Sequence, residues 1–166
     1  MNIQADLRHV IYALSDALDL VGVDDVSHGK RVGIMAAECA KVQGLAEAEQ
    51  IFLFDLGMLH DIGVSNTQTH SKLVGEFDWD GSQLHARIGG ALLSTFAPLA
   101  RMGLPVHYHH TRWEHLLRDG VDDSVARLAN QIYLVDRVDA LAAPYYSNNT
   151  LLQHSEDIRH SIRQYA

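Results

Sequence analysis

The sequence predicts an all-helical protein, and three observations support this. Apolar residues recur at intervals of three and four along most of the chain, as in amphipathic helices. Glycine and proline residues stand at the ends of the periodic segments, where they can stop helices. No segment has a convincing strand pattern. With 166 residues, 47% of them apolar, the chain is expected to form one domain over residues 1–166 with a single packed core.

Two helices are predicted at the start of the chain. The first, over about 7–21, has apolar residues at helical spacing and is followed by Gly22 as a stop signal. Asp24 or Asp25 can cap the second helix, and Gly44 can end it. The apolar positions of the second helix include Val32, Met35, Ala36 and Cys39. Cys39, the single cysteine, is expected to be a small core residue.

The third predicted helix runs from about 46 to 62 and is apolar on nearly all sides, which is typical of a central, buried helix. Gly63 offers a left-handed cap at its end. The pair His60–Asp61 stands in the last turn. Such surroundings will bury both side chains, and buried ionisable groups need a partner because their desolvation is costly.

A polar loop over 64–81 separates this helix from the next one, which starts near Ser82. The apolar residues of this fourth helix are Leu84, Ile88, Leu92, Leu93 and Phe96. We expect His85 to share a face with Ile88 and Leu92, and therefore to point inward.

The remaining sequence completes a bundle of about six to seven helices. Pro98 begins a short helical piece, and Pro105 follows a break at Gly103. A long helix over about 124–143 stops at Pro144, and a final helix starts at Leu151. The chain ends at Ala166 without a capping signal after a basic, helical stretch, which favours a C-terminally trimmed fragment.

Charge and hydropathy limit the partners. The net charge is −8 and there is no cluster of Lys and Arg, so the electrostatic footprint for duplex nucleic acid or an anionic membrane is missing. No apolar stretch reaches membrane-spanning length and no signal peptide is recognisable, which predicts a cytoplasmic protein. An acidic protein can still bind a phosphate ester if metal ions supply positive charge.

Eleven histidines are many for so short a chain. Seven candidate metal ligands stand on helices or helix junctions with apolar neighbours: His28, His60, Asp61, His85, His109, His110 and Asp136. Each alone is ambiguous, since a single histidine on an apolar face is more often a core residue with a hydrogen-bond partner. Together they could hold two ions that share one carboxylate, and two ions about 3.5–4 Å apart can activate a hydroxide and clamp a phosphate.

Two further aspartates are ambiguous. Asp24 lies one turn before His28 and could reach the same place, although capping of the second helix is favoured. Asp139 lies one turn after Asp136 and competes with it as a ligand. We expect Asp139 to bond to local groups at the helix end or in the following loop.

The order His…His-Asp…His…His-His…Asp resembles the HD superfamily of metal-dependent phosphohydrolases, and more narrowly its HD-GYP branch, whose members hydrolyse cyclic di-GMP. The resemblance covers about residues 20–145. The matching segments are His28-Gly-Lys-Arg-Val32, His60-Asp-Ile-Gly63, His85-Ala-Arg-Ile-Gly-Gly90, His109-His110 and Val135-Asp-Arg-Val-Asp-Ala-Leu141. The fold implied is an HD-domain helical bundle.

The resemblance also implies roles for these residues. His28, His60, Asp61 and Asp136 would bind a first metal ion, and Asp61 would bridge to a second ion held by His85, His109 and His110. Asp24 matches a position where some members bind a third metal. The metals implied are iron or manganese, although other divalent transition metals are compatible with these ligands. Asp61 and His60 would be catalytic, with a bridging water or hydroxide attacking phosphorus.

The sequence departs from the HD-GYP pattern in two places. Val64 stands where the family has a lysine that assists at the phosphate, and the Gly-Tyr-Pro signature after the double histidine is absent. Arg112 could supply phosphate-binding charge instead, or it could be a solvated loop residue.

Three functions follow as hypotheses. The first is a phosphohydrolase acting on a small phosphodiester or phosphomonoester, such as cyclic di-GMP or another nucleotide. The second is a signalling module that binds metal or nucleotide with impaired catalysis, which the two departures favour. The third is a mixed-valent diiron oxygenase, a chemistry used by some HD-fold proteins. The first helix, outside the motif core, could form a homodimer.

Overall fold

The computed structural model describes residues 5–20, 27–64 and 82–164, and all regular structure in these ranges is helical. The predicted all-α fold is therefore confirmed. The helices are α1 (Leu7–Asp19), α2 (His28–Val42), α3 (Glu47–Leu59), α5 (Ser82–Thr95), α6 (Ala100–Tyr108), α7 (Trp113–Arg118), α8 (Asp123–Ala142) and α9 (Ser155–Ile162). Short 3-10 turns lie at Ala97–Leu99, Ala143–Tyr145 and Leu151–His154.

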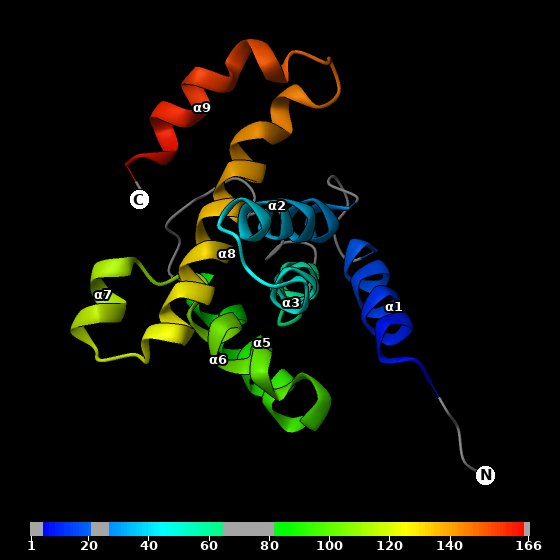
Figure 1. The fold of residues 1–166 in the computed structure, drawn as a ribbon. Coiled ribbons are helices and arrows are strands. Elements are labelled where there is room, and N and C mark those ends of the chain that lie inside the picture. The colour runs from blue at the N-terminus through cyan, green and yellow to red at the C-terminus, as the bar shows by residue number, and fades with distance from the viewer. Residues whose placement is uncertain (1–4, 21–26, 65–81, 165–166) are drawn as a thin grey trace.

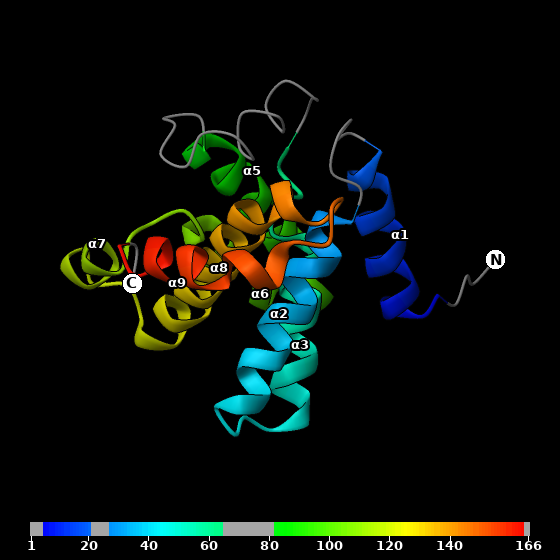
Figure 2. The ribbon, with the colours of Figure 1, turned by 90° about the horizontal axis from the view of Figure 1, so that it is seen from above.

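Two helix pairs and one long helix form the body of the molecule (Figure 1). Helix α2 packs along α3, α5 packs along α6, and α8 contacts α2, α3 and α6. Figure 2 shows α1 on one side of the α2–α3 pair and α7 on the other. The C-terminal helix α9 packs on α8. Because α8 crosses both pairs, a side chain from its middle can meet residues from each of them.

Helix α3 is central in its second half, as its composition predicts. Leu53, Leu56 and Leu59 are fully buried there, and Met58 is nearly so. Gly57 allows the close approach of α2, since a Cβ atom at this position would lie 2.6 Å from the Cα atom of Gly33. This approach brings the first residue of α2 next to the end of α3.

The start of α2 differs from the prediction. Its N-cap residue is Ser27, which has a left-handed φ of 78° and makes no side-chain cap. The backbone N–H of Ser27 instead donates to Asp19 of α1 at 2.9 Å, and Lys30 donates to the other oxygen of the same carboxylate. Asp24 and Asp25 lie outside the described residues. Gly44 ends α2 with a φ of +73°, as expected.

The prediction of a left-handed cap at Gly63 was wrong. Among the described glycines, only Gly44 and Gly120 have a positive φ. Gly63 is required for packing instead, because a Cβ atom there would lie 2.0 Å from the carbonyl oxygen of His85 and 2.5 Å from the amide nitrogen of Gly89. The turn after α3 is thus pressed against the backbone of α5.

The buried face of α5 also differs from the prediction. His85 is buried, as expected, but it shares its face with Ala86 and Leu93. The residues Leu84, Ile88, Leu92 and Phe96 are exposed. Helix α5 meets its neighbours through small residues, since Gly89 lies against Gly63 and Gly90 lies against Gly103 of α6. Close backbone contact, rather than the largest apolar side chains, decides which face is buried.

Two further expectations were wrong. Cys39 is exposed, because the buried stripe of α2 follows Val32, Ala36 and Ala40 at intervals of one turn and Cys39 lies to one side of it. Helix α6 continues through Gly103 without a break and contains Pro105. Pro144, in contrast, follows the end of α8 as predicted.

Among the described helices, none combines the length and the apolar character that crossing a membrane requires.

The packing of Gly63 gives a test of the fold. We expect Gly63→Ala to lower the free energy of unfolding by about 3 kcal/mol, because its Cβ atom would meet backbone atoms that cannot move aside. Gly44→Ala, which has open space but a positive φ, should cost only about 1 kcal/mol. Urea unfolding of the metal-free variants measures both, and equal losses would contradict the packing role of Gly63.

Candidate metal centre

The seven predicted ligands come from five separate elements and converge on one place. His28 is the first residue of α2, and His60 is the C-cap residue of α3, directly before Asp61. His85 lies in the first turn of α5, and Asp136 lies in α8. His109 caps the C-terminus of α6, and His110 follows it. Helix ends therefore supply most of the site, and α8 closes it with one carboxylate.

The first group of ligand atoms consists of His28, His60 and Asp136, whose ligand atoms lie within 4.8 Å of one another. The Nε2 atom of His28 is 3.3 Å from Oδ1 of Asp136. The Nε2 atom of His60 is 3.7 Å from the same oxygen. Two imidazole nitrogens thus face one carboxylate oxygen.

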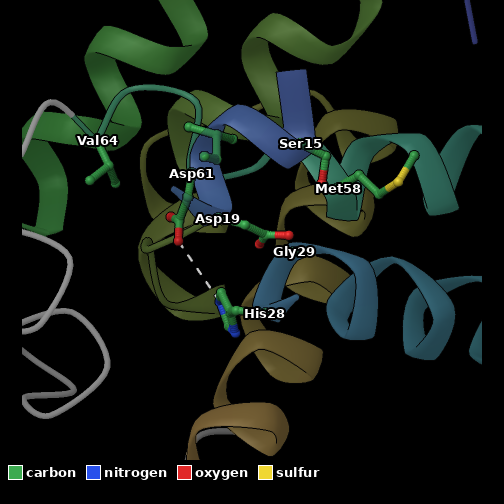
Figure 3. A pocket seen from close by; sticks show the side chains of 8 residues that line it. Ser15, Asp19, His28, Gly29, Met58, Asp61 and Val64 are labelled. Carbon is green, nitrogen blue, oxygen red and sulfur yellow. Dashed lines mark ion pairs between the residues drawn. The ribbon is translucent and has the colours of Figure 1, made fainter. Parts of the chain in front are cut away.

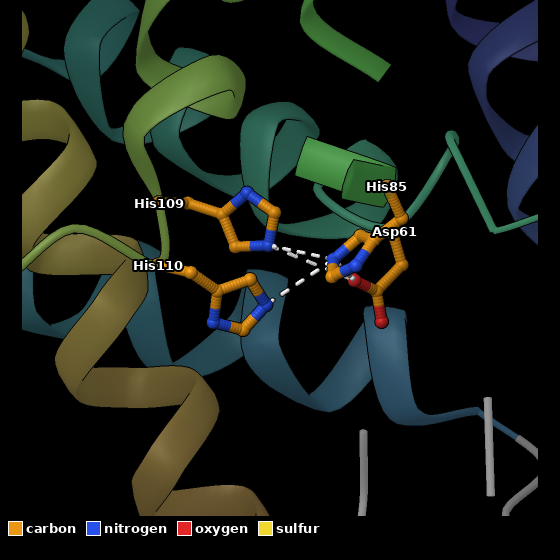
Figure 4. Close-up of side chains that lie close together, drawn as sticks. All are labelled: Asp61, His85, His109 and His110. Atoms are coloured by element: carbon orange, nitrogen blue, oxygen red, sulfur yellow. Dashed lines mark hydrogen bonds and ion pairs between the residues drawn. The ribbon is translucent and has the colours of Figure 1, made fainter. Parts of the chain in front are cut away.

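The second group consists of Asp61, His85, His109 and His110 (Figure 4), also with its ligand atoms within 4.8 Å of one another. The Nε2 atom of His85 lies 3.3 Å from that of His109 and 3.2 Å from that of His110. Three ring nitrogens point toward one another beside a carboxylate.

Asp61 faces both groups, with one oxygen toward each. Its Oδ1 atom lies 3.1 Å from Nε2 of His85 and 3.7 Å from Nε2 of His109. Its Oδ2 atom lies 3.4 Å from Nε2 of His60 and 3.8 Å from Nε2 of His28. This is the arrangement of a carboxylate that can bridge two cations.

Hydrogen bonds at the outer ring nitrogens orient two of the imidazoles. The Nδ1–H group of His60 donates to the carbonyl oxygen of Gly57 at 2.7 Å, and that of His109 donates to the carbonyl oxygen of Val106 at 2.6 Å. In the neutral rings, both Nε2 atoms must then carry lone pairs directed into the site. Such outer-ring bonds are typical of metal-binding histidines.

The residues present fit a metal ion on the evidence of their buried nitrogens. Nε2 of His60 is fully buried and has no hydrogen-bond partner. A buried acceptor without a partner is costly, and neighbouring lone pairs repel one another. A cation between the groups would satisfy these atoms, and imidazole together with carboxylate suits divalent transition metals.

The electrostatics of the site favour positive charge. Burial alone would raise the pKa of Asp61, but His60, His109 and His85 outweigh it and hold this pKa well below its usual value. Burial likewise opposes ionisation of Asp136, yet His28 and His60 keep the pKa of Asp136 well below the usual range. Both carboxylates therefore remain ionised inside the protein, where a cation compensates them best.

The imidazoles divide into two kinds. Burial by itself would lower the pKa of His28, but Asp136 and Asp139 raise it well above the ordinary value. Burial, followed by the neighbouring His109, lowers the pKa of His110 well below that value. The second group therefore holds His110 as a neutral ring, the form that binds metals.

Sequence reasoning missed the role of Asp139. This residue was expected to bond to local groups only, but it is fully buried and accepts from Nδ1 of His28 in α2 at 2.7 Å. Arg31 of α2 and Tyr146, which follows α8, also donate to it. Of these three partners, only Tyr146 is one of the local groups that the sequence predicted for Asp139. The signal in the sequence was the spacing of one turn from Asp136.

Arg137 is a second missed residue. It is 2% exposed, and its Nη1 atom lies 3.7 Å from Oδ2 of Asp136. Its guanidinium group also lies over the ring of Tyr133, 4.1 Å from the centroid. A buried arginine within an apolar helix was the available signal, because arginine is almost never fully buried unless it is paired.

The other predicted site residues lie outside or beside the two groups. Asp24 is outside the described residues. Arg112 is the half-buried N-cap residue of α7. Val64 is 7% exposed and lines, with Asp61 and His28, a cavity of about 20 Å³ (Figure 3). This cavity has room for little more than a water molecule.

Two curated proteins are similar to the chain, both from Vibrio cholerae. The chain is 40% identical to 3'3'-cGAMP-specific phosphodiesterase 1 over 140 residues, which are 84% of this chain and 32% of that protein. It is 27% identical to 3'3'-cGAMP-specific phosphodiesterase 3 over 150 residues, 85% of this chain and 32% of that protein. The chain thus spans about a third of the length of these relatives.

No protein-family model matches the chain. No solved structure matches it either.

The second group gives a direct test of metal binding. We expect His85→Ala to lower the metal content of the protein, because its imidazole lies close to His109, His110 and Asp61. The exposed His115 is the matched control, and His115→Ala should keep the wild-type metal content. Elemental analysis of protein loaded with Mn²⁺ measures both. Wild-type metal content in His85→Ala would contradict the assignment.

Proposed function

The chain is related to the HD superfamily of metal-dependent phosphohydrolases, with the HD-GYP branch nearest in the order of its motifs, and on this premise we propose that it hydrolyses a phosphodiester in a cyclic dinucleotide. The observation that carries this proposal is Asp61, which directs one oxygen toward each of two histidine groups. A bridging carboxylate between two imidazole-rich groups is the arrangement that two-metal phosphoester hydrolysis needs.

We assign two divalent transition-metal ions to the site, iron or manganese. His28, His60, Asp61 and Asp136 would hold the first ion, and Asp61, His85, His109 and His110 the second. When bound, such a pair supplies Lewis acidity, a nucleophile at neutral pH and a clamp for phosphate oxygens. The ligand sets rest on the proximity of the atoms in each group and on the resemblance.

The protein itself supplies orientation and charge. Gly57 and Val106 hold the rings of His60 and His109 so that Nε2 faces inward. The side chains of Asp61 and Asp136 are 14% and 13% exposed, whereas those of His60 and His109 are at most 1% exposed. A phosphate therefore approaches on the side of the two carboxylates, where bound cations offset their negative charge. Arg137, close to Asp136, adds positive charge behind this carboxylate.

The substrate class comes from the relatives and from the chain's own departures. Both relatives are named for 3'3'-cGAMP, so this cyclic dinucleotide is the first substrate to test, with cyclic di-GMP beside it. Val64 brings no charge to the phosphate, and Arg112, two residues after His110, is our candidate for this role. A cytoplasmic location and a homodimer through α1 stay predictions of the sequence.

A nucleotide-binding module with impaired catalysis is the second candidate. The buried, apolar Val64 beside Asp61 favours it, since valine can neither donate a hydrogen bond nor carry charge. Tight binding of a cyclic dinucleotide to metal-loaded protein without turnover would select this function. Iron-dependent oxygen consumption with a small organic substrate would instead select the oxygenase alternative.

Asp61 provides the test of catalysis. We expect Asp61→Asn to lower kcat for 3'3'-cGAMP by at least about 100-fold, because it removes the charge that both groups share. Chromatography of the products formed by Mn²⁺- or Fe²⁺-loaded protein measures the rate. Asp123→Asn, at an exposed position at the start of α8, is the control. Wild-type protein that turns over no phosphodiester or phosphomonoester would overturn the proposal.

Arg112 provides the test of phosphate binding. We expect Arg112→Ala to raise KM for the cyclic dinucleotide about 10-fold while kcat changes little, because a contact made equally in the ground state and the transition state contributes to binding without changing kcat. Arg118→Ala is the control, since Arg118 is exposed and pairs with Asp119. Steady-state kinetics separate the two parameters. A KM for Arg112→Ala equal to that of the control would remove Arg112 from the binding site.

A further inference from the structure

Asp139 is a buried carboxylate whose two oxygens are both engaged. Its Oδ2 atom accepts from Nδ1 of His28 at 2.7 Å and from Nη2 of Arg31 at 2.9 Å. Its Oδ1 atom accepts from Nε of Arg31 at 2.8 Å and from the hydroxyl of Tyr146 at 2.6 Å. Four donor groups from two segments, α2 and the turn after α8, therefore fix the position of one carboxylate that is fully buried.

The bond to His28 determines which nitrogen of that ring faces the metal centre. Because Nδ1–H donates to Asp139, Nε2 is the atom directed at Asp136 and Asp61, at 3.3 and 3.8 Å. A neutral ring with its hydrogen on Nε2 could not donate that lone pair to a cation. Asp139 thus selects the tautomer that a metal ligand requires.

Tyr146 belongs to the turn that follows Ala143–Tyr145, beyond the matching motif segments. Its hydroxyl donates to Oδ1 of Asp139, whereas His28 donates to Oδ2. The guanidinium group of Arg31 lies over the ring of Tyr146, 4.8 Å from the ring centroid. Burial, together with Asp139, raises the pKa of Tyr146 well above its usual value, so this group stays a donor.

We propose that Asp139 and Tyr146 are positioning residues of the metal centre: Asp139 holds His28 in its metal-binding tautomer, and Tyr146 holds Asp139. The inference rests on the proposed function insofar as the centre binds metal. With this role for Tyr146, the segment after α8 contributes to the metal centre, although none of the described residues in that segment is a predicted metal ligand. Neither residue is assigned contact with substrate.

The variants Asp139→Asn and Tyr146→Phe test this proposal in the full chain. Tyr145→Phe is the matched control, because Tyr145 is the adjacent tyrosine, is also half-buried and stacks on His154 rather than bonding to Asp139. Zn²⁺ is the probe, since it is diamagnetic and takes imidazole ligands. Competition titration measures Zn²⁺ affinity, and the ¹⁵N shifts of the His28 ring show which nitrogen carries the hydrogen.

We expect Zn²⁺ affinity to fall about 10- to 100-fold in Asp139→Asn and about 3- to 10-fold in Tyr146→Phe, because the latter loses one hydrogen bond to a charged group. The ¹⁵N shifts of His28 should move in both variants and stay unchanged in Tyr145→Phe. If Asp139→Asn does not fold, as judged by circular dichroism, Tyr146→Phe alone carries the test.

The outcomes separate this inference from the proposed function. Wild-type affinity and unchanged His28 shifts in Tyr146→Phe would overturn the positioning role, whatever the enzyme hydrolyses. Wild-type protein that binds Zn²⁺ but cleaves no cyclic dinucleotide would overturn the proposed hydrolase function. The Zn²⁺ affinities of the variants would still decide whether Asp139 and Tyr146 are positioning residues. Wild-type protein that binds no Zn²⁺ would overturn the inference, whereas turnover by Mn²⁺- or Fe²⁺-loaded protein decides the function.

Discussion

The burial of ionised carboxylates among imidazoles is the constraint on which the rest of the structure depends. Asp61 and Asp136 keep a low pKa although burial opposes their ionisation. Desolvated charge of this kind is tolerated only when partners of opposite charge are held in place. Five helix-borne histidines surround these carboxylates, and their convergence requires every helix of the body to take a particular position.

Glycine contacts make that convergence possible. Gly57 lets α2 lie directly against α3, and Gly63 lets the turn carrying Asp61 lie against α5. Gly90 and Gly103 do the same between α5 and α6, which brings His85 next to the histidines at the end of α6. Because α5 packs through its glycine side, larger apolar residues of this helix, such as Leu84 and Ile88, remain exposed. The geometry of the site therefore depends directly on the close packing of the helices.

A second tier of contacts connects the centre to the surrounding helices. Backbone carbonyl groups orient His60 and His109, whereas a carboxylate orients His28. That carboxylate, Asp139, depends in turn on Arg31 and Tyr146. The relation to phosphodiesterases concerns about a third of the length of those proteins. Val64, one of the chain's two departures from the family pattern, lines the small cavity beside Asp61 and His28.

The sequence by itself determined the helical class, the approximate extent of α2, α3 and α8, and the seven residues that converge, because periodicity and ligand type are local properties that a linear pattern retains. Only the tertiary structure decided that Asp61 faces both groups, that Asp139 serves His28 and that α5 buries its glycine side. Each of these depends on how closely two backbones approach and which distant side chains then meet. Cys39 and Ile88 show the same limit: helical spacing identifies apolar residues, but the neighbouring helix decides which of them are covered.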